Sequence, residues 1–361
     1  MQLFYIFVAI LMFGILVAIH EFGHFAVAKL CNVRVTEFSI GMGPLLWNFE
    51  RGETKYSLRA LPLGGYCMFD GDEEETRDER SLLSQGFFKQ LWILLAGSGM
   101  NLLLGFLIML GLYSSAVGFY TCVLTGLAPE VSSAVSLQAG DEIYRIDGER
   151  VYLFSDISLL LSMGDGESYD FVVIRDGEKV TFTDVPLVYQ TYSAQDGSTY
   201  EGYGIYLGDI EEATVGRVVN TAWNSTLNFA RMVKFGFEML FSGEAGVEDV
   251  TGPIGIVDTI SQVGTASATV WIALENIAYF TAMLSINLFV MNLLPIPALD
   301  GGRILFLVLN AGTMLVFKKK IPERYLNNVT IVGFVLLMGL GILITFKDVF
   351  VILQDLLPFL G

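Results

Sequence analysis

Histidine, cysteine and charged side chains are all scarce in this sequence of 361 residues. It has two histidines and three cysteines, and charged residues make up only 16% of it. Cys31, Cys67 and Cys122 are odd in number, lie far apart and form no Cys-x-x-Cys pair, which argues against a disulfide framework. The low charge, together with 53% hydrophobic residues and a mean hydropathy of +0.57, argues against an ordinary soluble enzyme and indicates a membrane protein.

Four apolar runs are long enough to cross a bilayer, whose ~30 Å hydrocarbon core needs about 20 helical residues. They cover residues 3–28, 91–117, 278–299 and 329–346. The first run could be mistaken for a signal peptide. However, no basic residue precedes it and it is longer than the apolar region of a signal peptide, so we expect a retained span.

The basic residues predict the orientation of these spans. None precedes the first span, whereas Lys29 and Arg34 follow it and a further group lies between the last two spans: Arg303, Lys318, Lys319, Lys320 and Arg324. We therefore expect both termini outside, residues 29–90 and 301–328 in the cytoplasm, and residues 118–277 outside. The net charge of −17 is concentrated between the second and third spans, which favours a water-exposed domain and argues against a nucleic-acid partner.

Short β-like segments lie on both sides of the second span. Residues 46–49 and 56–61 flank the turn Arg51-Gly52-Glu53 and predict a hairpin at the membrane face, followed by an acidic, solvated loop over residues 70–80. Residues 119–208 alternate short strands with glycine turns. Residues 214–241 predict a helix, either interfacial and amphipathic or packed on the β-domain, and the sequence Gly-Pro-Ile-Gly at 252–255 predicts a turn or re-entrant break.

The only two histidines lie together in the sequence His20-Glu21-Phe22-Gly23-His24, within the first apolar run. Residues four apart lie on the same face of a helix, so both imidazoles can reach one metal ion while Glu21 projects beside them. Two imidazoles and a carboxylate that accepts a proton from water are typical of zinc hydrolases. Such a short pattern can arise by chance, but the absence of histidine elsewhere argues against this.

A catalytic zinc site needs a third protein ligand, which must here be a carboxylate or a cysteine. Asp300 is the best candidate, because it follows two helix-breaking prolines at the end of an apolar run and precedes two glycines. A carboxylate at membrane depth is costly and usually functional. Alternatively, Asp300 is a helix-end residue at the interface that pairs with Arg303.

Together these segments resemble the site-2 protease family of intramembrane zinc metalloproteases, in particular the bacterial regulators of sigma-factor signalling with a single PDZ domain. The resemblance covers nearly the whole chain in order and rests on HEFGH at 20–24, AGSGMN at 96–101, a PDZ-like segment around 137–148, GPIGI at 252–256 and NLLPIPALDGGR at 292–303. One difference is Ser98, where the family usually has a proline.

The resemblance implies a fold and a set of site residues. The fold is an α-helical polytopic membrane protein with about four transmembrane helices, a membrane-associated β-hairpin or sheet and an inserted extracytoplasmic PDZ-like β domain. His20, His24 and Asp300 are expected to bind Zn²⁺, and Glu21 to act as general base and acid. The residues expected to contact substrate are Asn292 and, in the hairpin, Tyr56, Ser57 and Leu58.

The expected function is hydrolysis of peptide bonds within or near transmembrane segments in the bacterial inner membrane, on substrates first cut by another protease. Such regulated intramembrane proteolysis could act on an anti-sigma factor or on leftover signal peptides. Two other classes stay open at this point. One is a non-catalytic adaptor that binds peptides through the PDZ-like domain, and the other is a transporter whose intramembrane acids and histidines carry ions or protons.

The predicted organisation has eight segments. They are span 1 with HEFGH (1–30), the cytoplasmic hairpin and acidic loop (31–90), span 2 (91–117), the PDZ-like domain (118–210), an amphipathic segment (211–270), span 3 with NLLPIPALDGG (271–300), a cytoplasmic loop (301–328), and span 4 with the C-terminal tail (329–361).

Overall fold

The computed structural model describes residues 1–361 except 71–78, 133–135, 165, 194–198, 320 and 357–361. The chain forms two compact units, which we describe separately. Unit 1 comprises Met1–Ile108 and Phe229–Gly361, and unit 2 comprises Met109–Asn228. Most of the predicted acidic loop at 70–80 lies outside the described residues.

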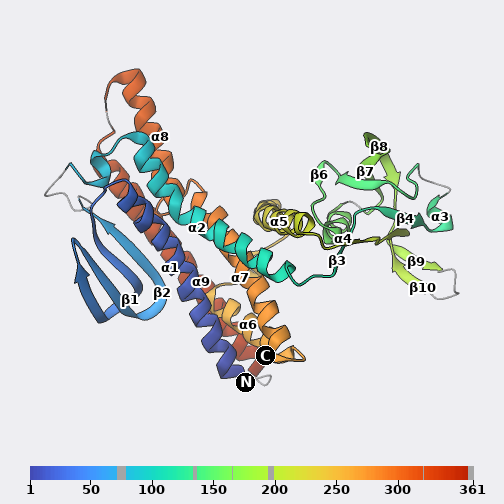
Figure 1. The fold of residues 1–361 in the computed structure, drawn as a ribbon, viewed down its shortest axis with the longest axis horizontal. Coiled ribbons are helices and arrows are strands. Elements are labelled where there is room, and N and C mark those ends of the chain that lie inside the picture. Colours follow the sequence, from blue (N-terminus) through green and yellow to red (C-terminus); the bar gives the residue numbers. More distant parts are fainter. Residues whose placement is uncertain (71–78, 133–135, 165, 194–198, 320, 357–361) are drawn as a thin grey trace. The chain divides into compact units, whose positions relative to one another are not determined.

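Unit 1 is built mainly from helices, which are α1 (Gln2–Leu30), α2 (Phe87–Tyr113), the second half of α5 (Val215–Ser242), α6 (Pro253–Ala266), α7 (Val270–Leu293), α8 (Asp300–Phe317) and α9 (Glu323–Leu356). Short 3₁₀ turns occupy Leu82–Ser84 and Val247–Asp249. The main core cluster joins one face of α1, with Tyr5 and Leu16, to Ile260 of α6 and Ile277 of α7. In Figure 1, α2 runs back along α1, and the hairpin lies against α1.

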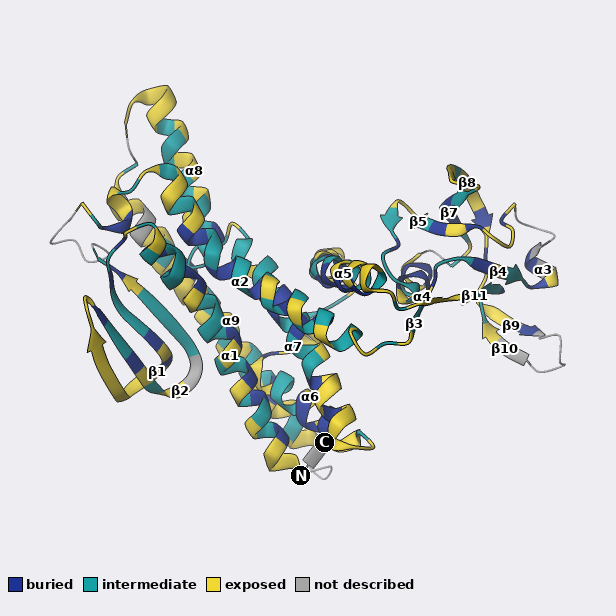
Figure 2. Cartoon of the chain, viewed as in Figure 1, coloured by how far each residue is buried: buried dark blue, intermediate teal, exposed yellow. Residues whose placement is uncertain are grey.

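Five helices in the described part of the chain are long and apolar enough to cross a membrane, judged by length and composition alone. They are α1, α2, α7, α8 and residues Asn328–Gln354 of α9. Large apolar side chains of α8 and α9 are exposed, and Figure 2 colours much of α8 as exposed. Such faces suit contact with lipid hydrocarbon, because exposing many large apolar side chains to water is unfavourable.

The expectation of a loop over residues 301–328 was wrong for most of that range, because residues up to Phe317 form α8. The helix carries the apolar sequence Ile-Leu-Phe-Leu-Val-Leu at 304–309, which the neighbouring glycines and basic residues obscured. The third predicted span also ends earlier than expected: α7 stops at Leu293, before Pro295 and Pro297.

The Gly-Pro-Ile-Gly sequence at 252–255 begins a helix. Gly252 is the N-cap of α6 and Pro253 occupies the first turn, where a missing N–H costs nothing. Asp348 of α9 is buried and accepts a hydrogen bond of 2.9 Å from the Gly255 amide. Since α6 also packs Gly264 against Tyr5, it joins the start of α1 to the end of α9 at one end of unit 1.

The predicted hairpin is confirmed and is longer than expected, with β1 at Val35–Arg51 and β2 at Thr54–Phe69. Both strands bend, so residues 37–40 of β1 pair with residues 55–58 of β2 on one side and with residues 65–68 on the other. Residues 56–58 therefore lie between two stretches of β1, residues 38–40 on one side and residues 47–49 on the other. The last part of β2, from Gly65 to Phe69, is an outer segment that pairs only with β1 among the described strands.

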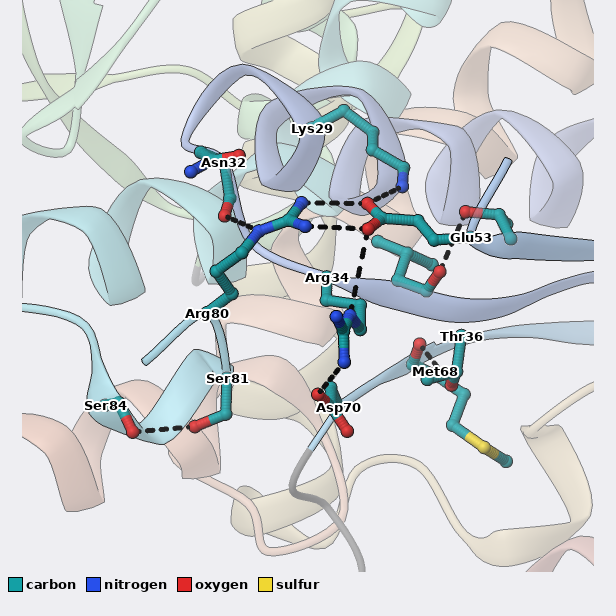
Figure 3. Close-up of polar contacts among 12 residues, drawn as sticks. Lys29, Asn32, Arg34, Thr36, Glu53, Met68, Asp70, Arg80, Ser81 and Ser84 are labelled. Carbon is teal, nitrogen blue, oxygen red and sulfur yellow. Dashed lines mark hydrogen bonds and ion pairs between the residues drawn. The ribbon is translucent and has the colours of Figure 1, made fainter. Parts of the chain in front are cut away.

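An ionic cluster holds the hairpin turn beside the end of α1 (Figure 3). The carboxylate of Glu53 accepts hydrogen bonds of 2.8 Å from Lys29 and from Arg80, and lies 3.7 Å from Arg34. Hydrogen bonds from Arg80 and Lys29 lower the pKa of Glu53 to about 2. Two of the basic residues used to predict orientation are therefore also structural contacts of the turn.

Unit 2 contains the predicted β-domain. A four-stranded antiparallel sheet has the order β6 (Glu149–Arg150), β5 (Glu142–Ile146), β7 (Ser168–Arg175) and β8 (Glu178–Pro186), and α4 (Phe154–Met163) follows β6. Two-stranded pairs join β3 (Gly118–Tyr120) to β12 (Ile210–Glu212), β4 (Leu124–Leu127) to β11 (Ile205–Leu207), and β9 (Gln190–Ser193) to β10 (Thr199–Gly202), and α3 is Pro129–Ser132. Within and just after the PDZ-like segment predicted around 137–148, residues 142–150 form a strand, a turn and a strand, whereas the likeness to a PDZ domain stays a prediction.

Candidate metal centre

Two helices bring the predicted site residues together. Helix α1 carries His20, Glu21 and His24, and the two histidines lie about one turn apart on the same face, as their four-residue spacing predicts. Asp300 is the first residue of α8, placed there because the prolines at 295 and 297 interrupt the chain after α7. The backbone just before it is unusual, since Ala298 has a φ of +80°.

The three candidate ligand atoms form a nearly equilateral triangle. His20 Nε2 lies 3.2 Å from His24 Nε2 and 3.3 Å from Asp300 Oδ2, and the remaining side, from His24 Nε2 to Asp300 Oδ2, is 3.2 Å. Ligands at ~2.05 Å from a tetrahedral zinc ion stand ~3.3 Å apart, so the triangle has the size of one face of such a site. Two imidazoles and a carboxylate also match the donor set of catalytic zinc sites.

The polar atoms of this triangle lack other partners. Asp300 Oδ2 is buried and has no hydrogen-bond partner among the described residues. His24 Nδ1 lies 2.8 Å from the carbonyl oxygen of Ile93, which can only accept, so Nδ1 carries the hydrogen and Nε2 presents a lone pair. Electron-pair donors that converge at this spacing need a positive charge between them. The residues therefore fit a bound divalent cation.

Close packing of α2 on α1 positions His24. Gly97 is buried, and a Cβ added there would lie 2.6 Å from His24 Cε1 and 2.7 Å from Cδ2. Only glycine lets the helix backbone approach the imidazole this closely. The sequence prediction gave no role to Gly97 or to Asn101, whose side-chain amide lies 3.4 Å from His20 Nδ1. Both belong to the AGSGMN segment at 96–101, and its likeness to the family was the feature of the sequence that could have identified them.

Glu21 lies in a cavity of about 380 Å³ that also contains the three candidate ligands. The last part of β2 forms one wall, and the main-chain amide of Cys67 donates a hydrogen bond to the Glu21 carboxylate. Gly65 makes this approach possible, because a Cβ there would meet Ser39 O at 2.8 Å and Glu21 Cγ at 3.3 Å. The strand and the carboxylate are thus held in direct contact.

The predicted substrate-contact residues separate into two groups. Asn292 lines the cavity, and its contact with substrate stays a prediction. Tyr56, Ser57 and Leu58 are absent from its lining: Tyr56 stacks on Phe49, and the Ser57 hydroxyl donates to Glu37 at 2.6 Å. The bends in the hairpin place residues 64–67, and not residues 56–58, beside the cavity, so contact of residues 56–58 with substrate stays a prediction.

Asp300 contacts the two histidines and does not pair with Arg303, the alternative partner that the sequence left open. Arg303 also lines the cavity, but within the described residues Asp300 forms its ionic contacts with the two imidazoles and none with Arg303. The carboxylate is thus directed at the histidines, as a shared metal ion requires. These contacts do not match the alternative that Asp300 is a helix-end residue at the interface paired with Arg303.

Comparison with known proteins agrees with this geometry. The model for peptidase family M50 matches residues 8–340. Two relatives are provisionally named as zinc metalloproteases. The protein from Clostridium perfringens (strain 13) is 34% identical to this chain, over 96% of this chain and 98% of the relative. The protein from Clostridium acetobutylicum is 36% identical, over 97% of this chain and 98% of the relative.

A third relative is the zinc metalloprotease RasP of Shouchella clausii, which is 27% identical over 94% of this chain and 97% of its own length. The family match makes the chain a protease for which zinc is the expected metal, in preference to a transporter or a non-catalytic adaptor. Its apolar helices indicate a multi-pass membrane protein. The chain belongs to peptidase family M50, the site-2 protease family of zinc metalloproteases.

Proposed function

We propose that this protein is an intramembrane endopeptidase that hydrolyses peptide bonds within or near transmembrane segments of other membrane proteins. His20, His24 and Asp300 bind the zinc ion, and Glu21 is the general base and acid. The convergence of three ligand atoms from α1 and α8, beside a carboxylate in one cavity, carries this proposal. The apolar composition of both helices supports a site at membrane depth.

In the proposed hydrolysis, the metal and the side chain of Glu21 have different roles. When bound, zinc supplies Lewis acidity toward water and toward the scissile carbonyl. Glu21 accepts a proton from the attacking water and delivers it to the leaving nitrogen, since it is the one carboxylate in the cavity lining besides Asp300 within the described chain. The Cys67 amide holds Glu21 in place, so the carboxylate does not have to reorganise during proton transfer.

The substrate must expose its backbone before it can be cut. A transmembrane helix satisfies its N–H and C=O groups internally, so it must unwind locally and find new partners for the released groups. The outer segment of β2 from Gly65 to Phe69 is suited to this role, because it borders the cavity and pairs with a strand on one side only. We assign Asn292, which lines the same cavity, to contact with this stretch of substrate.

Unit 2 and the topology complete the proposal. We place residues 118–277 and both termini outside the cytoplasmic membrane of a bacterium, with the cavity open to the cytoplasm. This topology requires an even number of crossings, so one of the five apolar helices does not cross the membrane by itself. Unit 2, as a PDZ-like domain, selects substrates that another protease has already shortened. The joining of the start of α1 and the end of α9 by α6 supports placing the two termini on the same side.

Cleavage of a transmembrane peptide by purified protein in liposomes tests the proposed chemistry. We expect Glu21→Gln to abolish cleavage, with at least a 10²-fold loss, while it keeps one zinc per chain. Asp300→Asn should lose both activity and zinc. Glu50→Gln, in the exposed part of the hairpin, is the matched control and should keep both. Full cleavage by the Glu21 variant would contradict the proposal.

A further inference from the structure

The two imidazoles of the candidate site have different partners on their outer nitrogens. His24 Nδ1 donates to the main-chain carbonyl of Ile93 at 2.8 Å, which leaves Nε2 unprotonated and turned toward the site. A backbone carbonyl cannot be changed by mutation of a side chain. His20 Nδ1 instead faces the side chain of Asn101, at 3.4 Å from Nδ2.

The Asn101 amide is fully buried and only half satisfied. Its Oδ1 has no hydrogen-bond partner among the described residues, although Asn101 has no exposed surface. A buried amide oxygen without a donor is costly, because it has lost its hydrogen bonds to water and gained none from the protein. The main chain at the same residue is held firmly, because its carbonyl accepts a hydrogen bond of 2.7 Å from Ser285 of α7.

The position of the ring hydrogen on His20 decides how the side-chain amide of Asn101 is oriented. If Nδ2 donates to His20 Nδ1, the ring hydrogen of His20 must sit on Nε2, where it points at His24 and Asp300 and blocks metal binding. A half-turn of the amide exchanges Oδ1 and Nδ2 without changing the shape of the side chain. Oδ1 then accepts from Nδ1–H, and His20 Nε2 presents a lone pair as His24 does.

We propose that Asn101 is a positioning residue for His20. Its Oδ1 accepts the Nδ1–H hydrogen bond and thereby fixes both the tautomer and the ring orientation that metal binding needs. The proposal rests on the metal centre of the proposed function and adds a residue that is not a metal ligand and acts through His20. Partners of this kind are typically worth 10-fold to 100-fold in metal affinity.

Three variants separate this role from simple packing. Asn101→Asp keeps an oxygen acceptor and removes the NH₂ donor, whereas Asn101→Leu keeps similar bulk and removes both. Ser285→Ala removes the hydrogen bond to the Asn101 main chain and leaves its side chain in place, so it controls for loosened packing of α2 on α7. Zinc affinity of each purified full-length protein is measured in detergent by competition with a chelator.

Asn101→Leu should weaken zinc binding by 10-fold to 100-fold, and Asn101→Asp should stay within about 3-fold of the wild type. Ser285→Ala should also keep its affinity. An unchanged affinity in Asn101→Leu, or an equal loss in the Leu and Asp variants, would overturn the proposal. If Asp300→Ala kept its zinc, the metal centre itself would be refuted, which is a different failure.

A spectroscopic measurement reads the tautomer directly and does not require activity. Because the chain has two histidines, ¹⁵N-histidine labelling gives signals from these rings alone. The wild type without zinc should show both rings protonated at Nδ1. Asn101→Leu should change this pattern for one ring, and Asn101→Asp should keep it. A His20 ring protonated at Nε2 in the zinc-free wild type would overturn the assignment.

Discussion

Replacing Gly97 by alanine should damage the metal centre through a single added methyl group. The added Cβ would lie 2.6 Å from His24 Cε1 and 2.7 Å from Cδ2, and nearer still to Nε2. Carbon atoms in contact normally stand about 3.5–4.0 Å apart. The imidazole or α2 must therefore move by roughly 1 Å.

A displacement of this size is large compared with the tolerance of a metal site. The His24 ring is fixed at one end by the Ile93 carbonyl, so it cannot move away and keep both contacts. Misplacement of a functional group by about 1 Å can cost 10²-fold in rate. We therefore expect Gly97→Ala to lower zinc affinity at least 10-fold and cleavage about 10²-fold.

Gly99→Ala is the matched control for this change. It lies in the same helix, and nothing stands within 4 Å of the added Cβ. Alanine favours the helix over glycine by about 1 kcal/mol at both positions, so intrinsic propensity alone predicts stabilisation in both variants. Zinc content, a transmembrane-peptide cleavage assay and thermal unfolding are compared for the two proteins. Wild-type zinc affinity and cleavage in Gly97→Ala would refute the packing argument.

Three further predictions concern the cavity wall, the residue before Asp300 and the hairpin turn. Gly65→Val, which crowds Ser39 O and Glu21 Cγ, should lower cleavage about 10-fold and leave zinc content unchanged; loss of zinc would contradict it. Ala298→Gly should raise the free energy of unfolding by ~1 kcal/mol, seen as a higher Tm, because Ala298 has a φ of +80°; an unchanged Tm would argue against strain there. Ionised Glu53 has a pKa lowered from 4.5 to about 2, so its stabilising contribution is complete above pH 4.5 and is lost as pH falls through 2. At neutral pH, Glu53→Gln should therefore destabilise the turn by ~1 kcal/mol and speed trypsin cleavage after Arg51, whereas Glu50→Gln should not.

The candidate ligands could be predicted from the sequence because their chemistry limits the choices. Two histidines in the whole chain, four positions apart on a predicted helix, can share one metal ion, and the structure brings them together. Asp300 followed from the need for a third ligand and from its place after two prolines. The hairpin turn at Gly52 was also predictable, because the residues on either side of it have the alternation typical of strands.

Other features depended on tertiary packing that local patterns do not encode. The bends in β1 and β2 bring residues 64–67 to the cavity and enclose residues 56–58, which the alternation of side chains alone cannot reveal. Helix α8 was missed because glycines and basic residues flank its apolar sequence. The contacts of Gly97 and Asn101 with the histidines depend on how α2 packs against α1.

Zinc content of the purified protein tests the central claim most directly. Metal analysis should find one zinc per chain in the wild type and less than about 0.1 in Asp300→Ala, because two imidazoles alone do not make a stable site. Glu275→Ala, which removes an exposed carboxylate of α7, should keep one zinc per chain. Full zinc occupancy in Asp300→Ala would contradict a metal ion shared between α1 and α8.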